Sequence, residues 1–217
     1  MFKGVVFDFD GVIVDSHPVH KRAWRRFLES VGRTATEEEL QFVLDGRKRD
    51  DILRHFLGDL DPQLIIKYGR RKEQLFRDEA GDVQTVNGLL SFLADLEDAG
   101  VAMGVASSGS RSRVNFLLNR LDLKKYFRVV ITGEEVKEGK PHPAVFLRAA
   151  QNLRMDPAEV IVFEDALSGV KAAKTAGMKC IGIAKPDGAS GLLEAGANHV
   201  MPDFRPLSFL KLQDLFN

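Results

Sequence analysis

The sequence predicts an α/β protein, a Rossmann-like doubly wound parallel sheet with an inserted helical domain, and three observations carry that prediction. Short β-branched and apolar runs alternate with longer helical patterns over most of the chain. Each run is too short and too uniformly apolar for a half-exposed strand, which is typical of parallel strands buried on both faces. The segment 16–82 shows helical periodicity and no strand signal. Such alternation predicts right-handed crossovers in an open sheet.

Six strands and five helices are predicted for the sheet domain. The strands cover Gly4–Asp8, Ala102–Ala106, Val129–Thr132, Val160–Glu164, Lys179–Ile183 and His199–Met201. The helices lie near Asn87–Ala99, Ser110–Leu121, Ala144–Asn152, Gly169–Ala176 and Ser190–Ala195. Because helical segments separate the strands, we expect the strands to run parallel.

The segment 16–82 is predicted to be a separate helical insert after the first strand. Val19, Ala23 and Phe27 recur every four residues, and further apolar groups follow around Leu40 and Ile52 and between residues 65 and 76. Four amphipathic helices are more than one crossover needs. We therefore divide the chain into a sheet core, 1–15 plus 83–217, and a four-helix insert, 16–82.

Composition narrows the class of protein. The chain has 217 residues, of which 44% are apolar, and its 31 basic residues balance 31 acidic ones. No net charge therefore favours nucleic acid or an anionic membrane. Cys180 is the single cysteine, which excludes an intrachain disulfide and fits a reducing compartment. No apolar run approaches the ~18 residues of a membrane span, and no leader-like segment precedes Asp8. We expect a cytoplasmic protein with no nucleic-acid or membrane partner.

Two acids follow the first strand. Asp8 and Asp10 come directly after four apolar residues, and alternation along an extended chain would place both on one side. Ligands of open α/β sheets bind at this carboxyl edge. An aspartate beside Gly11 is also a common turn former. Two adjoining carboxylates repel, however, unless a cation or a shared proton relieves them, so the pair is a stronger functional signal than a lone Asp-Gly turn.

Polar groups also follow the later strands of the predicted sheet. They are Ser107-Ser108-Gly109, Lys140-Pro141 and Glu164-Asp165. Each segment also has a structural explanation when it is taken singly. The serines are a typical helix N-cap, Lys-Pro is typical of a surface turn, and the two acids could cap the start of the next helix. Polar groups at the ends of four successive strands form a constellation, which predicts one site at this edge.

These segments resemble, in the same order, the four motifs of the haloacid dehalogenase superfamily of phosphatases and phosphomutases. The motifs stand here as Asp8-Phe9-Asp10-Gly11-Val12-Ile13-Val14-Asp15, Ser107, Lys140-Pro141 and Glu164-Asp165. The resemblance covers essentially the whole chain, and the insert is similar to the family's small α-helical cap. It implies a monomeric, Mg²⁺-dependent phosphomonoester hydrolase that acts on a small phosphorylated metabolite, a sugar phosphate, through an aspartyl-phosphate intermediate.

The resemblance also implies a role for each core residue. Asp8 is the expected nucleophile, and Asp10 is the expected acid and base. Ser107 and Lys140 are expected to bind the transferring phosphoryl group. The expected Mg²⁺ ligands are Asp8, the main-chain carbonyl of Asp10, Asp165 and, in an assisting role, Glu164. Dehalogenation is disfavoured, because a halide leaves without the proton that Asp10 would supply.

Three residues of the insert resemble residues of one member, β-phosphoglucomutase. They are His20, Arg49 and Lys72. The resemblance implies that His20 and Lys72 position Asp10 when the cap shuts, and that Arg49 binds a distal phosphate. A lone histidine in a helix is otherwise an ordinary surface or core residue.

One loop favours hydrolysis over the mutase reaction. Where the mutase continues with Ser-Lys-Asn to hold the non-transferring phosphate, this chain has Gly109-Ser110-Arg111-Ser112. Ser108 and Arg111 are the candidate binding residues here, since a guanidinium can bind phosphate through two hydrogen bonds. Mutase activity and, more remotely, a non-catalytic binding module stay open as alternatives. Most other basic residues of the insert, Arg47 and Lys48 among them, are expected on a solvated face.

Overall fold

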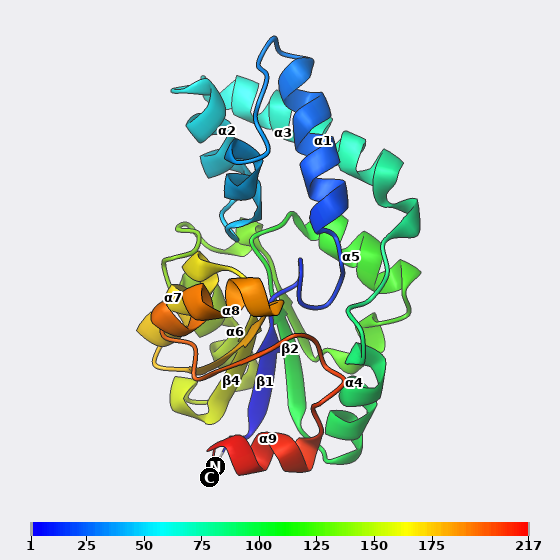
Figure 1. Cartoon of the computed structure of the whole chain (residues 1–217), viewed down its shortest axis with the longest axis vertical. Coiled ribbons are helices and arrows are strands. Elements are labelled where there is room, and N and C mark those ends of the chain that lie inside the picture. The colour runs from blue at the N-terminus through cyan, green and yellow to red at the C-terminus, as the bar shows by residue number, and fades with distance from the viewer. Residues whose placement is uncertain (1, 217) are drawn as a thin grey trace.

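The computed structural model describes residues 2–216 and contains a parallel sheet of six strands (Figure 1). The strands are β1 (Gly4–Phe7), β2 (Ala102–Ala106), β3 (Val129–Ile131), β4 (Val160–Glu164), β5 (Lys179–Ile183) and β6 (His199–Met201). Their order across the sheet is β3-β2-β1-β4-β5-β6, and every neighbouring pair is parallel. The chain therefore winds outward from β1 in both directions, which confirms the predicted doubly wound fold.

Helices connect the strands and form the insert. The α-helices are α1 (His17–Glu29), α2 (Arg49–Leu57), α3 (Pro62–Glu79), α4 (Leu89–Asp98), α5 (Arg111–Arg120), α6 (Ala144–Leu153), α7 (Leu167–Thr175), α8 (Pro186–Glu194) and α9 (Phe209–Phe216). Short 3₁₀ helices are η1 (Glu39–Leu44), η2 (Ala80–Asp82), η3 (Lys124–Tyr126), η4 (Gly133–Glu135) and η5 (Pro157–Glu159). Across residues 2–216, none of these helices combines the length and apolar character needed to cross a bilayer.

Side chains of β1 alternate between two apolar layers. Val5 and Phe7 pack into the layer that includes residues of α4, α5 and α9, and Val6 packs into the layer under α6, α7 and α8. The ring of Phe7 stacks on that of Phe163 with centroids 5.2 Å apart. Helices cover both faces (Figure 1), and this coverage explains why the strands carry no exposed polar face.

The insert lies beyond the carboxyl edge of the sheet and has an apolar cluster of its own (Figure 1). Trp24, Phe27 and Leu53 are fully buried in it. The structure corrects the second of the four predicted helices, because the segment around Leu40 forms the 3₁₀ helix η1. Its buried residues, Leu40 and Val43, are three apart, which matches the three-residue turn of a 3₁₀ helix.

Other element boundaries differ from the prediction for local reasons. Strand β1 ends at Phe7, one residue earlier than predicted. Thr132 lies outside β3 because it forms a capping box with Glu135 at the start of η4. Helix α8 begins earlier than predicted, at Pro186, where proline suits the first turn. Helix α9 was not predicted, and the backbone N–H of its Phe209 donates to a carboxylate of α4.

Candidate active site

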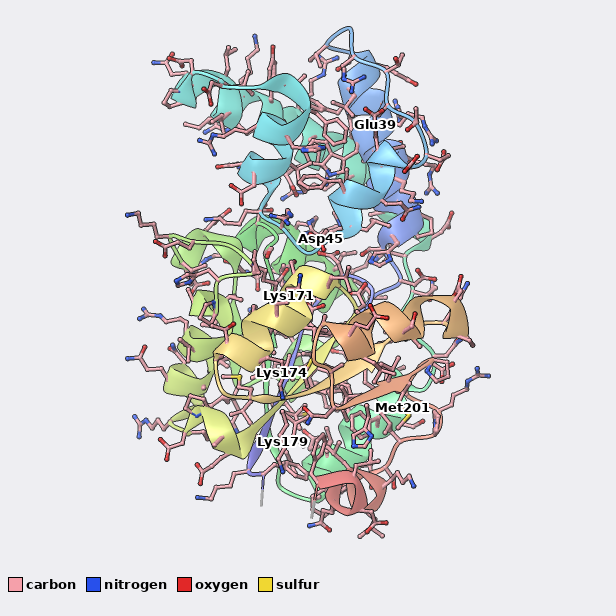
Figure 2. All side chains as sticks on the ribbon, turned by 60° about the vertical axis from the view of Figure 1, so that its left-hand side comes forward. Glu39, Asp45, Lys171, Lys174, Lys179 and Met201 are labelled. Carbon is pink, nitrogen blue, oxygen red and sulfur yellow. The ribbon has the colours of Figure 1, made fainter. Side chains whose placement is uncertain are left out.

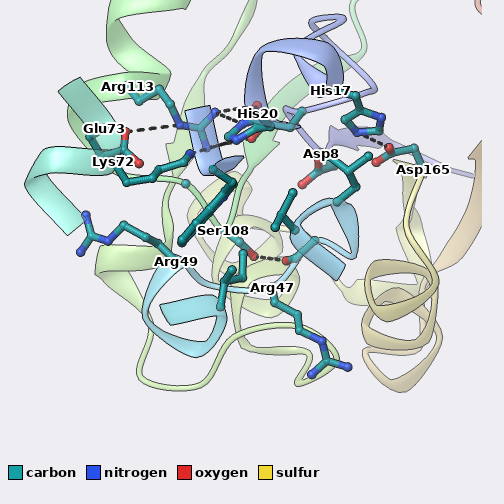
Figure 3. A pocket seen from close by; sticks show the side chains of 17 residues that line it. Asp8, His17, His20, Arg47, Arg49, Lys72, Glu73, Ser108, Arg113 and Asp165 are labelled. Carbon is teal, nitrogen blue, oxygen red and sulfur yellow. Dashed lines mark hydrogen bonds and ion pairs between the residues drawn. The ribbon is translucent and has the colours of Figure 1, made fainter. Parts of the chain in front are cut away.

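A cavity of about 60 Å³ lies between the carboxyl edge of the sheet and the insert. Seven of the predicted site residues line it, namely Asp8, Asp10, His20, Arg49, Lys72, Ser108 and Asp165. Three others, Ser107, Lys140 and Glu164, are fully buried. Figure 3 shows the acids Asp8 and Asp165 on one side of the cavity and the basic side chains Lys72 and Arg113 on the other. The topology therefore gathers residues that are far apart in the sequence.

Beneath the cavity, the buried ammonium group of Lys140 pairs with two acids. The ammonium group of Lys140 donates to a carboxylate oxygen of Asp8 and, at 2.5 Å, to Oε1 of Glu164. Burial and the carboxylates of Glu164 and Asp10 raise the pKa of Asp8 to about 7, although Lys140 opposes this shift. The pKa of Lys140 is raised, because its two acid partners outweigh the cost of burial. Lys140 therefore stays charged beside Asp8.

The acids Asp8, Glu164 and Asp165 form a cluster suited to a metal ion. Each offers a carboxylate oxygen, and these oxygens lie within 4.8 Å of one another. Burial raises the pKa of all three, and they also repel one another. A divalent cation would relieve that repulsion, and hard oxygen ligands are the set that Mg²⁺ prefers. The donor set therefore fits Mg²⁺.

Two neighbours shape this cluster. Nε2 of His17 lies 2.9 Å from Oδ2 of Asp165. Burial lowers the pKa of His17, but the Asp165 carboxylate outweighs burial and raises it to about 9, so the pair is ionic. Gly11 has φ of +79°, and a side chain there would overlap Asp165 and His17. Glycine is therefore needed at position 11 for the approach of these two side chains.

Asp10 lies beyond the end of β1, where a turn begins. Beyond β1 the carbonyl of Phe9 accepts the N–H groups of both Ile13 and Val14. This turn brings the Asp10 side chain to the cavity wall that Asp8 also lines. Asp8 and Asp10 therefore line one cavity, whereas Phe7 and Phe9 pack into one apolar layer, which is the alternation that the sequence predicted.

Three side chains hold the carboxylate of Asp10. Oδ1 accepts hydrogen bonds from Ser16 Oγ at 2.7 Å and from Arg113 Nη1 at 2.6 Å, and it lies 3.1 Å from His20 Nε2. Oδ2 accepts from Arg113 Nη2 at 2.8 Å. Burial alone would raise the pKa of Asp10, but the charge of Arg113 holds it well below its ordinary value. The side chain of Asp10 is thus fully engaged and does not join the three-carboxylate cluster.

His20 and Lys72 form a relay from the insert to Asp10. Lys72 Nζ lies 3.0 Å from His20 Nδ1, and both side chains are buried. Burial, Lys72 and Arg113 lower the pKa of His20 to about 3, and burial lowers that of Lys72 to about 8. An ammonium group can only donate, so the neutral ring accepts at Nδ1 and donates from Nε2 to Asp10. Of the three residues that resemble mutase residues, His20 therefore contacts Asp10 and Lys72 contacts His20.

The insert is joined to the core at the cavity rim. Ser108 Oγ donates to the carbonyl of Gly46 at 2.6 Å, and Ser168 donates from both its N–H and its hydroxyl to Asp45, which lies at the junction in Figure 2. Lys48 Nζ donates to the carbonyls of Val136 and Lys137. Lys48 is therefore not on the solvated face that the sequence predicted, and hydrogen bonds join the insert to the core.

Two further predictions about arginines need correction. Arg111, a candidate for phosphate binding, is paired with Glu135 at 3.3 Å, and its side chain is 59% exposed. It does not line the cavity, because at the start of α5 it points away from the side that Arg113 presents. Arg47 does line the cavity, although its guanidinium is paired with Asp45.

Sequence reasoning missed Arg113, His17 and Glu73. All three line the cavity, and Arg113 and His17 bind its acids directly. A signal existed for Arg113, which stands among the apolar positions Val114 and Leu117 on the buried side of α5. A buried arginine needs an anionic partner, and that requirement points toward the acids at the sheet edge.

Comparisons with known proteins agree with this geometry. Residues 5–183 match the family described as haloacid dehalogenase-like hydrolase. The phosphorylated carbohydrates phosphatase of Thermotoga maritima is 34% identical over 215 residues, covering 96% of this chain and 98% of that protein. Hexitol phosphatase A of Escherichia coli is 34% identical over 186 residues, covering 85% and 84%. The structure of β-phosphoglucomutase from Clostridium difficile superposes with a TM-score of 0.88 at 26% identity, covering 100% and 98%.

Proposed function

Because the chain belongs to the haloacid dehalogenase-like hydrolases and is a phosphatase of that type, we propose that it hydrolyses a small sugar phosphate by way of an aspartyl phosphate on Asp8. The observation that carries this proposal is the buried set around Asp8, in which Lys140 and the acid cluster meet at the sheet edge. The matched relatives named as carbohydrate and hexitol phosphatases support the substrate class.

Asp8 acts as the nucleophile in this proposal. Its carboxylate attacks phosphorus, and Lys140 holds it in place and offsets the negative charge around it. Asp8, Asp165 and Glu164 would hold Mg²⁺, which supplies charge neutralisation of the phosphoryl oxygens when bound. Ser107, buried beside the strand end, donates to a phosphoryl oxygen in the same scheme.

Asp10 acts as the acid and then the base. The contact with Arg113 keeps Asp10 ionised in the empty cavity, and the negative charge of a bound phosphate raises its pKa so that it can carry a proton to the leaving sugar oxygen. Asp10 later takes a proton from the water that attacks the aspartyl phosphate. The contacts from Ser16 and His20 keep its carboxylate at the cavity wall. The cavity between the insert and the core is small, which supports a small metabolite over a macromolecule as the substrate.

The experiment is phosphate release from glucose 6-phosphate, fructose 1-phosphate, mannitol 1-phosphate, glycerol 3-phosphate and p-nitrophenyl phosphate, with Mg²⁺ and with EDTA. Wild type should hydrolyse at least one sugar or hexitol phosphate, and EDTA should stop it. Asp8→Asn should abolish turnover while its circular dichroism spectrum stays that of the folded protein. Asp165→Ala should raise the Mg²⁺ concentration needed for half-maximal activity. Undiminished activity of Asp8→Asn, or of wild type in EDTA, would exclude this mechanism.

The second candidate function is that of a β-phosphoglucomutase. The structural similarity to that enzyme and the relay from Lys72 through His20 to Asp10 favour it. The two reactions separate cleanly when β-glucose 1-phosphate is supplied with a trace of glucose 1,6-bisphosphate. A hydrolase releases inorganic phosphate, whereas a mutase accumulates glucose 6-phosphate.

The wider setting of the enzyme is also part of the proposal. We expect it to act as a monomer in the cytoplasm, with residues 16–82 as the cap and 1–15 plus 83–217 as the catalytic core. Burial raises the pKa of the Cys180 thiol and leaves it unreactive, so it takes no part in this scheme.

A further inference from the structure

Arg113, on helix α5 of the core, binds the carboxylate of Asp10. Its Nη1 and Nη2 donate to Oδ1 and Oδ2 at 2.6 and 2.8 Å, so the guanidinium holds both carboxylate oxygens at once. The side chain of Arg113 is 4% exposed. Paired hydrogen bonds between two planar ions fix direction as well as distance. Arg113 lies on α5 and belongs to none of the four sequence motifs.

The surroundings of Arg113 keep the guanidinium in this orientation. Its Cζ lies 5.1 Å from the ring centroid of Phe76. A Cβ at position 109 would overlap Nη2, so Gly109 leaves the space that the guanidinium occupies. The planar group is therefore confined by an aromatic ring and by backbone, and it cannot turn freely away from Asp10.

The remaining nitrogen shows that Asp10 is the preferred partner. Within residues 2–216, Nε of Arg113 is the one buried side-chain nitrogen or oxygen that makes no hydrogen bond. Oε2 of Glu73 on α3 lies 3.6 Å from this nitrogen and accepts from Ser110 instead. An orientation that favoured Glu73 would satisfy Nε. The observed orientation leaves Nε without a bond and gives both terminal nitrogens to Asp10.

We propose that Arg113 is a positioning residue for Asp10, fixing the carboxylate from the core while Ser16 and His20 fix it from the other side. This inference rests on the proposed phosphatase function. Because Arg113 acts through Asp10, it matters only where Asp10 matters. A sugar alkoxide must be protonated as it leaves, whereas p-nitrophenolate departs unaided. The value of kcat/KM reports the steps up to formation of the aspartyl phosphate, and the leaving group departs in those steps. A comparison of kcat/KM for the two substrates therefore measures how much each leaving group depends on Asp10.

The test compares kcat/KM for p-nitrophenyl phosphate with that for the sugar or hexitol phosphate that wild type hydrolyses fastest. Arg113→Met should lower the sugar phosphate value by ~10²-fold, the usual penalty for a misplaced catalytic group, and the aryl phosphate value by under ~3-fold. Arg113→Lys keeps the positive charge but cannot donate two parallel hydrogen bonds to Asp10. Its kcat/KM for the sugar phosphate should lie between those of wild type and Arg113→Met. The control is Arg205→Met, which removes another arginine bound to an aspartate, Asp203, outside the cavity. It should change neither value.

A second arm asks whether Arg113 works through Asp10. In an Asp10→Asn background, Arg113→Met should lower the sugar phosphate value by under ~3-fold, since the two changes remove one function. Equal losses on both substrates, or a full ~10²-fold further loss in that background, would overturn the inference. If Arg113→Met does not fold, Arg113→Lys decides by the same two readouts. A wild type that hydrolyses none of the esters overturns the proposed function and this inference with it.

Discussion

Lys140 and Glu164 form an ion pair of 2.5 Å in which neither side chain is exposed to solvent. The same ammonium group also donates to Asp8. Removing one member of a buried ionic group leaves its partners uncompensated, which typically costs about 3–5 kcal/mol. In this protein the partners are two acids of the predicted metal site, so the stability of the core and the affinity for metal should be linked.

The first prediction follows from that link. Lys140→Met should lower the free energy of unfolding by about 3–5 kcal/mol at pH 7 in EDTA. Added Mg²⁺ should stabilise the variant more than wild type, because the metal replaces the lost positive charge. Urea denaturation with and without Mg²⁺ measures both effects. Lys125→Met is the control, since Lys125 pairs with Asp122 at an exposed site, where an ion pair contributes little to stability.

The second prediction concerns His17. Its pKa of about 9 depends on the Asp165 carboxylate. If Asp165 binds Mg²⁺, the metal neutralises that carboxylate, and the pKa of His17 should fall toward its ordinary value. An NMR titration of the imidazole signals with and without Mg²⁺ measures the shift. A His17 titration that Mg²⁺ leaves unchanged would remove Asp165 from the metal ligands.

The sheet was predictable because its physics is local. A strand buried on both faces must be apolar throughout, so β1, β4 and β5 appear in the sequence as short apolar runs. The carboxyl ends of parallel strands meet at one edge, so the order of the strands along the chain is enough to predict that Asp8, Lys140 and Glu164 lie together. Helix α9 was not predicted because it follows the last strand, where no crossover connection requires a helix.

The polar contacts of the cavity were harder to predict because they join distant segments. Arg113 meets Asp10 across 103 positions in the sequence, and no local pattern fixes which arginine of α5 turns inward. Arg111, two positions earlier, was the candidate and points outward. In a helix, residues two apart lie on opposite sides, so a small error in the helix phase exchanges the buried and exposed arginines.

The third prediction is a pH effect at His20, whose pKa of about 3 is below the ~6.5 of an unfolded chain. Between these values the unfolded state binds more protons, so stability rises with pH. The stability that the neutral, buried His20 contributes to the folded protein is fully present above about pH 6.5 and is lost as pH falls toward 3. His20→Gln lacks it, so the stability of wild type relative to the variant should shrink on acidification, by up to about 1.4 kcal/mol per pH unit. Urea denaturation at pH 7, 5.5 and 4 measures this, and a constant difference would contradict a neutral buried His20.

The last prediction concerns Arg49, at the start of α2 and on the cavity wall. Its guanidinium donates to the carboxylate of the half-exposed Asp50. The same group lies against Gly69 of α3, where a Cβ would overlap the guanidinium. An exposed acid is a weak competitor, so Arg49 is available for an anionic group of the substrate. Arg49→Ala should therefore weaken binding of a substrate with a distal phosphate by ~1.5–3 kcal/mol, the value of a charge-assisted hydrogen bond.

The control for Arg49 must come from the same helix. Lys48 is unsuitable, because its bonds to the carbonyls of Val136 and Lys137 join the insert to the core. Arg54 is exposed in the last turn of α2 and is the matched choice. The measurement is kcat/KM for fructose 1,6-bisphosphate, for fructose 6-phosphate and for p-nitrophenyl phosphate. Arg49→Ala should lower the first value most and the third little, and Arg54→Ala should change none. Equal losses on all three would mean that Arg49 supports the cap and does not read the distal group, since an aryl phosphate has no second anion to hold.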